Sequence, residues 1–86
     1  MFEVEYSSKA KKFLKSLDKH ILIRILERIE KLKENSVPSD AKFIGREAGE
    51  KIFRYRIGEF RALYQLKESD KTVLIIKIDK RPRVYD

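Results

Sequence analysis

Apolar and polar residues alternate along residues 51–66, KIFRYRIGEFRALYQL, which predicts a β-hairpin. The apolar set is Phe53, Tyr55, Ile57, Phe60, Ala62, Tyr64 and Leu66. The link Gly58-Glu59 is two residues long with Gly first, which suits a type II′ turn. One face of the hairpin is therefore expected to cover a core. The other face carries Arg54, Arg56 and Arg61.

Two amphipathic helices are predicted before the hairpin. Residues 2–6 alternate as a short strand, and Ser7 and Ser8 are candidate N-caps for the first helix. Asp18 can cap the second helix. The two apolar stripes have helical spacing and consist of Ala10, Phe13, Leu14 and Leu17, then Leu22, Ile25, Leu26, Ile29 and Leu32. These stripes predict an αα-hairpin that packs on the apolar face of the β-hairpin.

The remaining segments are a loop, a last strand and a tail. Residues 35–40 form a cluster of helix-breaking residues. Residues 41–50 are expected to be a loop because they contain Gly45 and Gly49, with Phe43 and Ile44 on the rim of the core. Residues 72–79, TVLIIKID, read as an interior strand. Its expected faces are Leu74, Ile76 and Ile78 on one side, and Val73, Ile75 and Lys77 on the other.

The order predicts one small α+β domain over residues 1–86, β-α-α-β-β-β, with an antiparallel sheet and the αα-hairpin on one sheet face. The opposite sheet face is then left open. Pro82 cannot donate to a ladder and marks the exit of the chain from the sheet. If the alternation continues through the last strand, several basic residues from three strands share this open face: Arg54, Arg56, Arg61, Lys77 and Arg81.

Charge and composition narrow the function. The net charge is +7; residues 1–50 hold 11 basic and 9 acidic residues, and residues 51–86 hold 10 and 5. A basic domain with clustered arginines is typical of a nucleic-acid or phosphate partner, although a solvated basic surface is the alternative. Without cysteine, disulfides and thiolate metal sites are excluded. Neither a membrane span nor a signal peptide is apparent, so we expect a cytoplasmic protein.

The candidate chemistry rests on arginine. The guanidinium is a planar fork of donors that suits phosphate oxygens, and Tyr85 offers a ring for base stacking. His20 is the only histidine and is expected on the surface; no cluster has metal-ligand spacing, and no glycine-rich phosphate loop occurs. We therefore expect no metal and no cofactor. An enzyme built this way would act by positioning and by cationic stabilisation of a charged transition state.

The whole chain resembles the RelE/ParE toxin superfamily, most closely archaeal RelE-type toxins, through FRYRIGEFRALYQL at 53–66 and KIDKRPRVYD at 77–86. The resemblance implies an mRNA interferase that acts in the ribosomal A site. It places Arg54 and Arg56 at basic positions of the family, Arg61 on the phosphate-binding arginine, Arg81 beside the leaving oxygen, and Tyr85 on the base-stacking tyrosine. Neighbouring basic residues expected to contact RNA are Lys51, Lys77, Lys80 and Arg83.

One departure affects the mechanism. Arg56 stands where some family members have a lysine that is proposed as the general base, and arginine is a poor base. Proton removal would then fall to Tyr85, to Lys51 or Lys80, or to water.

The resemblance also implies partners. We expect an acidic RelB-like antitoxin that is encoded alongside, is extended, and folds as it wraps the toxin. Ile21 and Ile23 lie off the apolar stripe and are expected to be partly exposed. The free toxin is expected to be monomeric. The toxin–antitoxin complex is expected to be hetero-oligomeric and to bind DNA. The alternatives are a ParE-like toxin that inhibits a topoisomerase, and a non-catalytic basic module that binds nucleic acid.

Overall fold

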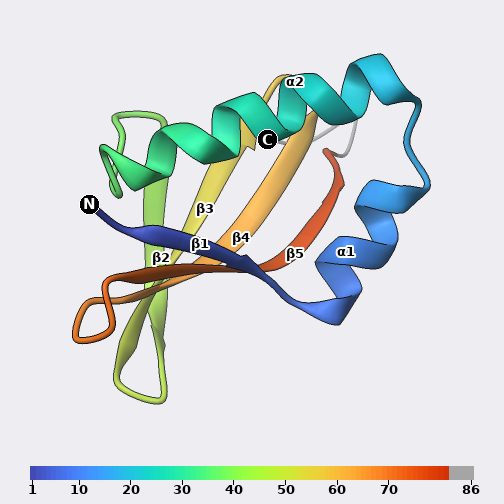
Figure 1. Cartoon of the computed structure of the whole chain (residues 1–86). Coiled ribbons are helices and arrows are strands. Elements are labelled where there is room, and N and C mark those ends of the chain that lie inside the picture. The colour runs from blue at the N-terminus through green and yellow to red at the C-terminus, as the bar shows by residue number, and fades with distance from the viewer. Residues whose placement is uncertain (82–86) are drawn as a thin grey trace.

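A computed structural model describes residues 1–81, so Arg83 and Tyr85 lie outside the described residues. The elements are β1 Glu3–Tyr6, α1 Ser8–Lys15, α2 Lys19–Glu30, a 3-10 turn η1 Lys31–Lys33, β2 Ala41–Glu47, β3 Glu50–Ile57, β4 Phe60–Lys67 and β5 Thr72–Lys80. The strands form one sheet in the order β1-β5-β4-β3-β2, and the helices lie on one face of it (Figure 1). The predicted α+β class is confirmed. Within residues 1–81, no helix is long and apolar enough to cross a membrane.

The helices begin where the sequence predicts. Ser7 is the N-cap of α1, and its hydroxyl accepts a hydrogen bond from the Ala10 amide at 3.0 Å. The same hydroxyl donates to the Ile76 carbonyl, which ties the start of α1 to β5. Asp18 occupies the N-cap position of α2 but makes no capping hydrogen bond through its side chain.

The core lies between the helices and the β3–β4 hairpin. The predicted apolar face is confirmed, because Phe53, Tyr55, Ile57, Ala62, Tyr64 and Leu66 are all buried, together with Ala10, Leu14, Ile25, Ile29 and Leu32. Gly58 has a φ of +58°, while Glu59 has no positive φ, as a type II′ turn requires. The buried Tyr64 hydroxyl donates to the Ser36 carbonyl at 2.6 Å, and burial raises the pKa of this tyrosine.

Residues 41–47 form an edge strand where the sequence analysis expected a loop. The two glycines have other roles. The register between β2 and β3 shifts between Phe43 and Gly45, and Gly45 has a φ of +151°, so this glycine accompanies a β-bulge. Ala48 and Gly49, with φ of 53° and 81°, form the two-residue turn into β3. Phe43 packs edge-on against Phe53 at 5.8 Å on the rim of the core, as expected.

A second bulge changes the predicted faces of the last strand. Leu63 pairs with Lys77, but the following residue, Tyr64, pairs with Ile75, so Ile76 is the extra residue of β5. Val73, Ile75 and Ile78 are therefore buried on the helix face. The expected grouping of Ile78 with Leu74 and Ile76 was wrong, and so was the grouping of Val73 and Ile75 with Lys77. Lys77 still faces away from the helices, as predicted. The sheet is also not fully antiparallel, since β1 runs parallel to β5.

The packing of α2 generates a stability prediction. Ile29 is fully buried and Ile23, on the same helix, is 45% exposed. We expect Ile29→Ala to lower the free energy of unfolding by about 2–5 kcal/mol, because it removes apolar contacts and leaves a cavity. The matched control, Ile23→Ala, should change it by less than about 0.5 kcal/mol. Urea denaturation measures both; equal losses would contradict this arrangement of the core.

Candidate nucleic-acid interface

Strand pairing sets charged side chains in two rows on the open face, the sheet surface opposite the helices. In the first row Arg56 pairs with Arg61, which in turn pairs with Asp79. The second row, one step along the strands, consists of Lys42, Arg54, Leu63 and Lys77. Directly paired residues on one face have Cβ atoms about 4.5–5.5 Å apart. Side chains that are distant in sequence therefore become immediate neighbours here.

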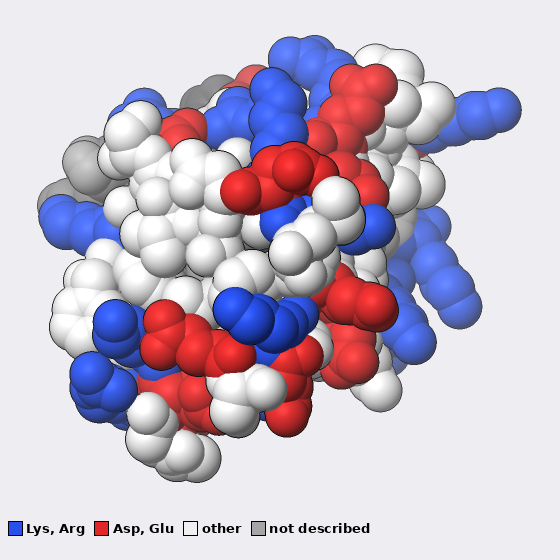
Figure 2. All heavy atoms as spheres, turned by 60° about the vertical axis from the view of Figure 1, so that its left-hand side comes forward, with Lys and Arg blue, Asp and Glu red and all other residues white. Residues whose placement is uncertain are grey.

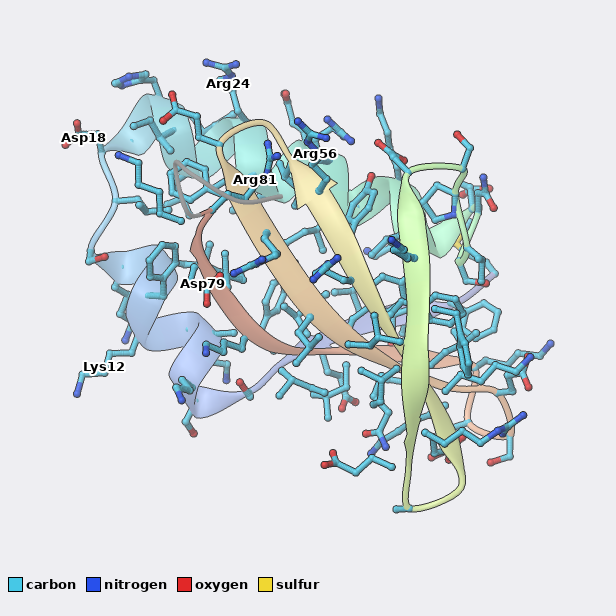
Figure 3. The ribbon with its side chains drawn as sticks, turned by 180° about the vertical axis from the view of Figure 1, so that it is seen from behind. Lys12, Asp18, Arg24, Arg56, Asp79 and Arg81 are labelled. Atoms are coloured by element: carbon cyan, nitrogen blue, oxygen red, sulfur yellow. The ribbon has the colours of Figure 1, made fainter. Side chains whose placement is uncertain are left out.

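A cavity of about 450 Å³ opens at this end of the sheet. Its lining consists of Ser39, Asp40, Ala41, Lys42, Arg54, Arg56, Arg61 and Arg81. Arg81 is fixed to the β3–β4 turn, because its amide donates to the Glu59 carbonyl at 2.7 Å and its Nη1 to the Gly58 carbonyl at 3.0 Å. Arg56 and Arg81 lie at the same end of the sheet in Figure 3. The structure thus brings together four of the five arginines that were selected from the sequence, the fifth being Arg83.

Arg28 of α2 supports one side of this cavity. Its Nη2 donates to Asp40 Oδ2 at 2.7 Å and to the Arg56 carbonyl at 3.2 Å. Its Nε donates to the Tyr55 hydroxyl at 3.3 Å, and the guanidinium lies 5.3 Å from the centre of the Tyr55 ring. The hydrogen bond with Tyr55 is the main cause that raises the pKa of Arg28. Arg28 therefore joins α2, the segment before β2 and the end of β3.

Asp79 is the carboxylate of the first row. Its Oδ1 lies 3.6 Å from Arg61 Nε, and its Oδ2 lies 3.4 Å from Lys77 Nζ. Asp79, Asp40 and Lys42 are site residues that were not predicted from the sequence. One feature of the sequence could have indicated Asp79: it lies two residues from both Lys77 and Arg81, and residues two apart in a strand share a face.

Two of the other predicted basic residues, Lys51 and Lys80, lie elsewhere. Lys51 pairs with the core residue Leu66, so it is on the helix side and at the opposite end of the hairpin from Arg56. Lys80 pairs with Phe60, whose ring packs against Phe13 of α1, and its Nζ lies 3.9 Å from Glu59 Oε1. Neither lysine joins the arginine cavity. Within residues 1–81 no group of three or more His, Cys, Asp or Glu side chains could hold a metal.

The arrangement suits an anion with several oxygens. Unlike this arginine-rich face, the side that lies on the left of Figure 1 carries both acidic and basic side chains around an uncharged area (Figure 2).

Arginines directly opposite one another, such as Arg56 and Arg61, repel each other unless a negative group lies between them. A phosphate in the cavity would receive bidentate, charge-assisted hydrogen bonds from guanidinium groups.

The cavity predicts a salt effect on binding. The probe is a 2′-O-methyl oligoribonucleotide, which cannot be cleaved. A plot of the logarithm of its binding constant against the logarithm of the salt concentration should be less steep for Arg61→Ala than for wild type. The expected difference in slope is about 0.7, the value for one phosphate contact on a single strand. The control is Lys12→Ala, since Lys12 is exposed on α1 and points outward, away from the cavity (Figure 3). Fluorescence anisotropy measures both slopes. Equal slopes for the two variants would exclude Arg61 from phosphate binding.

The family model for the ParE toxin of the type II toxin–antitoxin system parDE matches residues 4–85. RelE1 of Methanocaldococcus jannaschii, whose name describes it as a toxin, is 36% identical over 85 residues, which cover 98% of this chain and 94% of the relative.

Solved structures agree with this match. The archaeal RelE–RelB complex from Pyrococcus horikoshii OT3 superposes with a TM-score of 0.85 at 28% identity, covering 96% of this chain and 98% of that one. The toxin–antitoxin complex RelBE2 of Mycobacterium tuberculosis gives 0.77 at 27% identity, with 93% and 98% covered. The isolated E. coli RelE toxin shares the fold, with a TM-score of 0.76 at 17% identity; the match covers 96% of this chain and 87% of that one. The resemblance predicted from the sequence is confirmed: the chain belongs to the ParE toxin family of type II toxin–antitoxin systems and is a RelE-like toxin.

Proposed function

We propose that this toxin is an mRNA interferase, a metal-independent endoribonuclease that cleaves mRNA in the ribosomal A site and so inhibits translation. The observation that carries the proposal is the cavity on the open face, where four arginines converge. Arg54 and Arg56 come from β3, Arg61 comes from β4, and Arg81 directly follows β5. The similarity to RelE1 and to the archaeal RelE–RelB structure supports it.

The proposed reaction uses the ribose itself as the nucleophile. The 2′-hydroxyl attacks the adjacent phosphorus and yields a 2′,3′-cyclic phosphate and a 5′-hydroxyl. Arg61 and Arg54 neutralise the extra negative charge of the phosphorane, and Arg81 stabilises the leaving 5′-oxygen. Arg56, directly opposite Arg61, adds positive charge but cannot serve as a base. Tyr85, which lies outside the described residues, is assigned to base stacking.

The proposed partner is an acidic RelB-like antitoxin, since two of the similar structures are complexes with antitoxins. A second cavity, of about 800 Å³, lies between α2 and the β3–β4 turn. Its lining includes the apolar Ile21, Ile25, Ile57 and Phe60 and the basic Arg24, Arg28 and Lys31. Ile21 is half-buried and Ile23 is exposed, as the sequence predicted. This surface suits an amphipathic helix with acidic flanks.

Topoisomerase inhibition is the second candidate function, because the matching family model is that of the ParE toxin. The two functions leave different lesions in cells that express the toxin. Primer extension on cellular mRNA should reveal cuts at fixed codon positions if the toxin is an mRNA interferase. DNA breaks with intact mRNA would instead support inhibition of a topoisomerase. Binding to nucleic acid without any cut would support a non-catalytic binding module.

A substitution in the cavity tests the catalytic role of arginine. Arg61→Ala should reduce the single-turnover cleavage of ribosome-bound mRNA by about 10²–10³-fold, because it removes a charged group that stabilises the transition state. Lys12→Ala, on the exposed side of α1, serves as the control and should cleave at the wild-type rate. Circular dichroism should report the same fold for both. Near wild-type cleavage by Arg61→Ala would remove this residue from the proposed mechanism.

The net charge of +7 generates a prediction about antitoxin association. The association rate with the acidic protein encoded beside the toxin should fall about tenfold or more when the salt concentration is raised from low to high, because opposite charges steer the encounter. Stopped-flow fluorescence at several salt concentrations measures this rate. An association rate that does not respond to salt would argue against an electrostatically complementary partner.

A further inference from the structure

Cleavage by the 2′-hydroxyl needs a group that accepts its proton, and the four cavity arginines cannot do so. The identity of this proton acceptor matters only if the proposed function holds, and the inference rests on that function. The acceptor has to lie beside the group that binds the phosphate, because the attacking 2′-oxygen and the scissile phosphate occupy adjacent carbons of one ribose. Arg61 is the proposed phosphate ligand. The question is therefore which acceptor side chain neighbours Arg61.

The two lysines considered from the sequence do not meet this condition. Lys51 and Lys80 both pair with residues that face the helices, Leu66 and Phe60, so their side chains start on the wrong side of the sheet. Lys77 does lie on the open face, but a charged ammonium offers three donors and no acceptor.

Two carboxylates of residues 1–81 lie at or beside the cavity. Asp40 lines it, but Arg28 holds Asp40 Oδ2 at 2.7 Å, so this carboxylate is engaged in supporting the wall. Asp79 is the cross-strand neighbour of Arg61 on the same face. Its contacts to Arg61 Nε and Lys77 Nζ, at 3.6 and 3.4 Å, are ion pairs longer than a typical charge-assisted hydrogen bond. Its side chain is 37% exposed and is accessible to a ligand.

We propose that Asp79 is the general base of the reaction. An Asp79 carboxylate oxygen accepts the proton of the 2′-hydroxyl while the 2′-oxygen forms its bond to phosphorus. The bond from phosphorus to the 5′-oxygen breaks, the 5′-oxygen takes a proton from water, and Asp79 then returns its proton to solvent. Arg61 holds the phosphate and Lys77 lies on the other side of the carboxylate. Lys12 of α1 points outward (Figure 3). The other charged residues that line the cavity are Asp40, Lys42, Arg54, Arg56 and Arg81.

Asp79 has a rival role, which is only to position Arg61 through their ion pair. The two roles differ in their dependence on pH. A carboxylate base gives a cleavage rate that changes little between about pH 6 and 9. Without the base, hydroxide has to take the proton, so the rate rises about tenfold per pH unit. Loss of a positioning contact would instead lower the rate by one factor at every pH.

The experiment measures single-turnover cleavage of ribosome-bound mRNA across this pH range for wild type, Asp79→Asn, Asp79→Glu and the control Asp70→Asn. Asp70 is exposed in the β4–β5 turn, far from the arginines. We expect Asp79→Asn to be about 10²–10⁴-fold slower at pH 7 and to acquire the tenfold slope. Asp79→Glu should retain a flat profile, and Asp70→Asn should match wild type. Binding of a 2′-O-methyl mRNA should be no weaker in Asp79→Asn than in wild type.

Three results would overturn the proposal. The first is an Asp79→Asn rate close to wild type. The second is a uniform loss with an unchanged pH profile, which would make Asp79 a positioning residue. The third is a wild-type rate that itself rises with pH and loses that rise in Tyr85→Phe, which would assign the base to Tyr85. A wild type that leaves mRNA intact under all conditions would instead overturn the proposed function, and the inference with it.

Discussion

The alternation of side chains across β3 and β4 is the constraint on which the rest of the structure depends. Successive residues of a strand point to opposite faces, so a hairpin that buries Phe53, Tyr55 and Tyr64 under the helices has to present Arg54, Arg56 and Arg61 on the other side. A slip of one residue would exchange the two faces. The apolar core therefore fixes the position of the arginines as firmly as it fixes the fold.

The costs of gathering these arginines explain much of the surrounding polar structure. Like charges on one sheet face repel one another, and two carboxylates reduce this repulsion from opposite sides. Asp40 is bound by Arg28 at the β2 side, and Asp79 lies between Arg61 and Lys77 at the β5 side. Arg28 connects the core to the cavity wall, because it donates both to the hydroxyl of the buried Tyr55 and to Asp40.

Predictions from the sequence were correct where hydrophobic periodicity and turn residues determine the structure. They were wrong where a single residue changes the register of a strand. The hairpin, both helices, the N-cap at Ser7 and the arginine face follow from periodicity and turn chemistry. β2 was missed because Gly45 and Gly49 resemble loop residues, whereas they form a bulge and a tight turn inside a sheet. The bulge at Ile76 reversed the faces of half of β5, and no local pattern marks it. Asp79 was overlooked because its partner Arg61 is a cross-strand neighbour, which only the register reveals.

We propose that the arginine face of this sheet cleaves RNA through the ribose 2′-hydroxyl. The most direct test is the chemistry of the RNA ends that the cleavage leaves. Purified toxin is incubated with ribosomes that carry a defined mRNA, and the termini of the fragments are analysed by mass spectrometry. We predict a 2′,3′-cyclic phosphate on the upstream fragment and a 5′-hydroxyl on the downstream fragment, with the cut inside the A-site codon. Intact mRNA, or fragments that carry a 5′-phosphate, would contradict it.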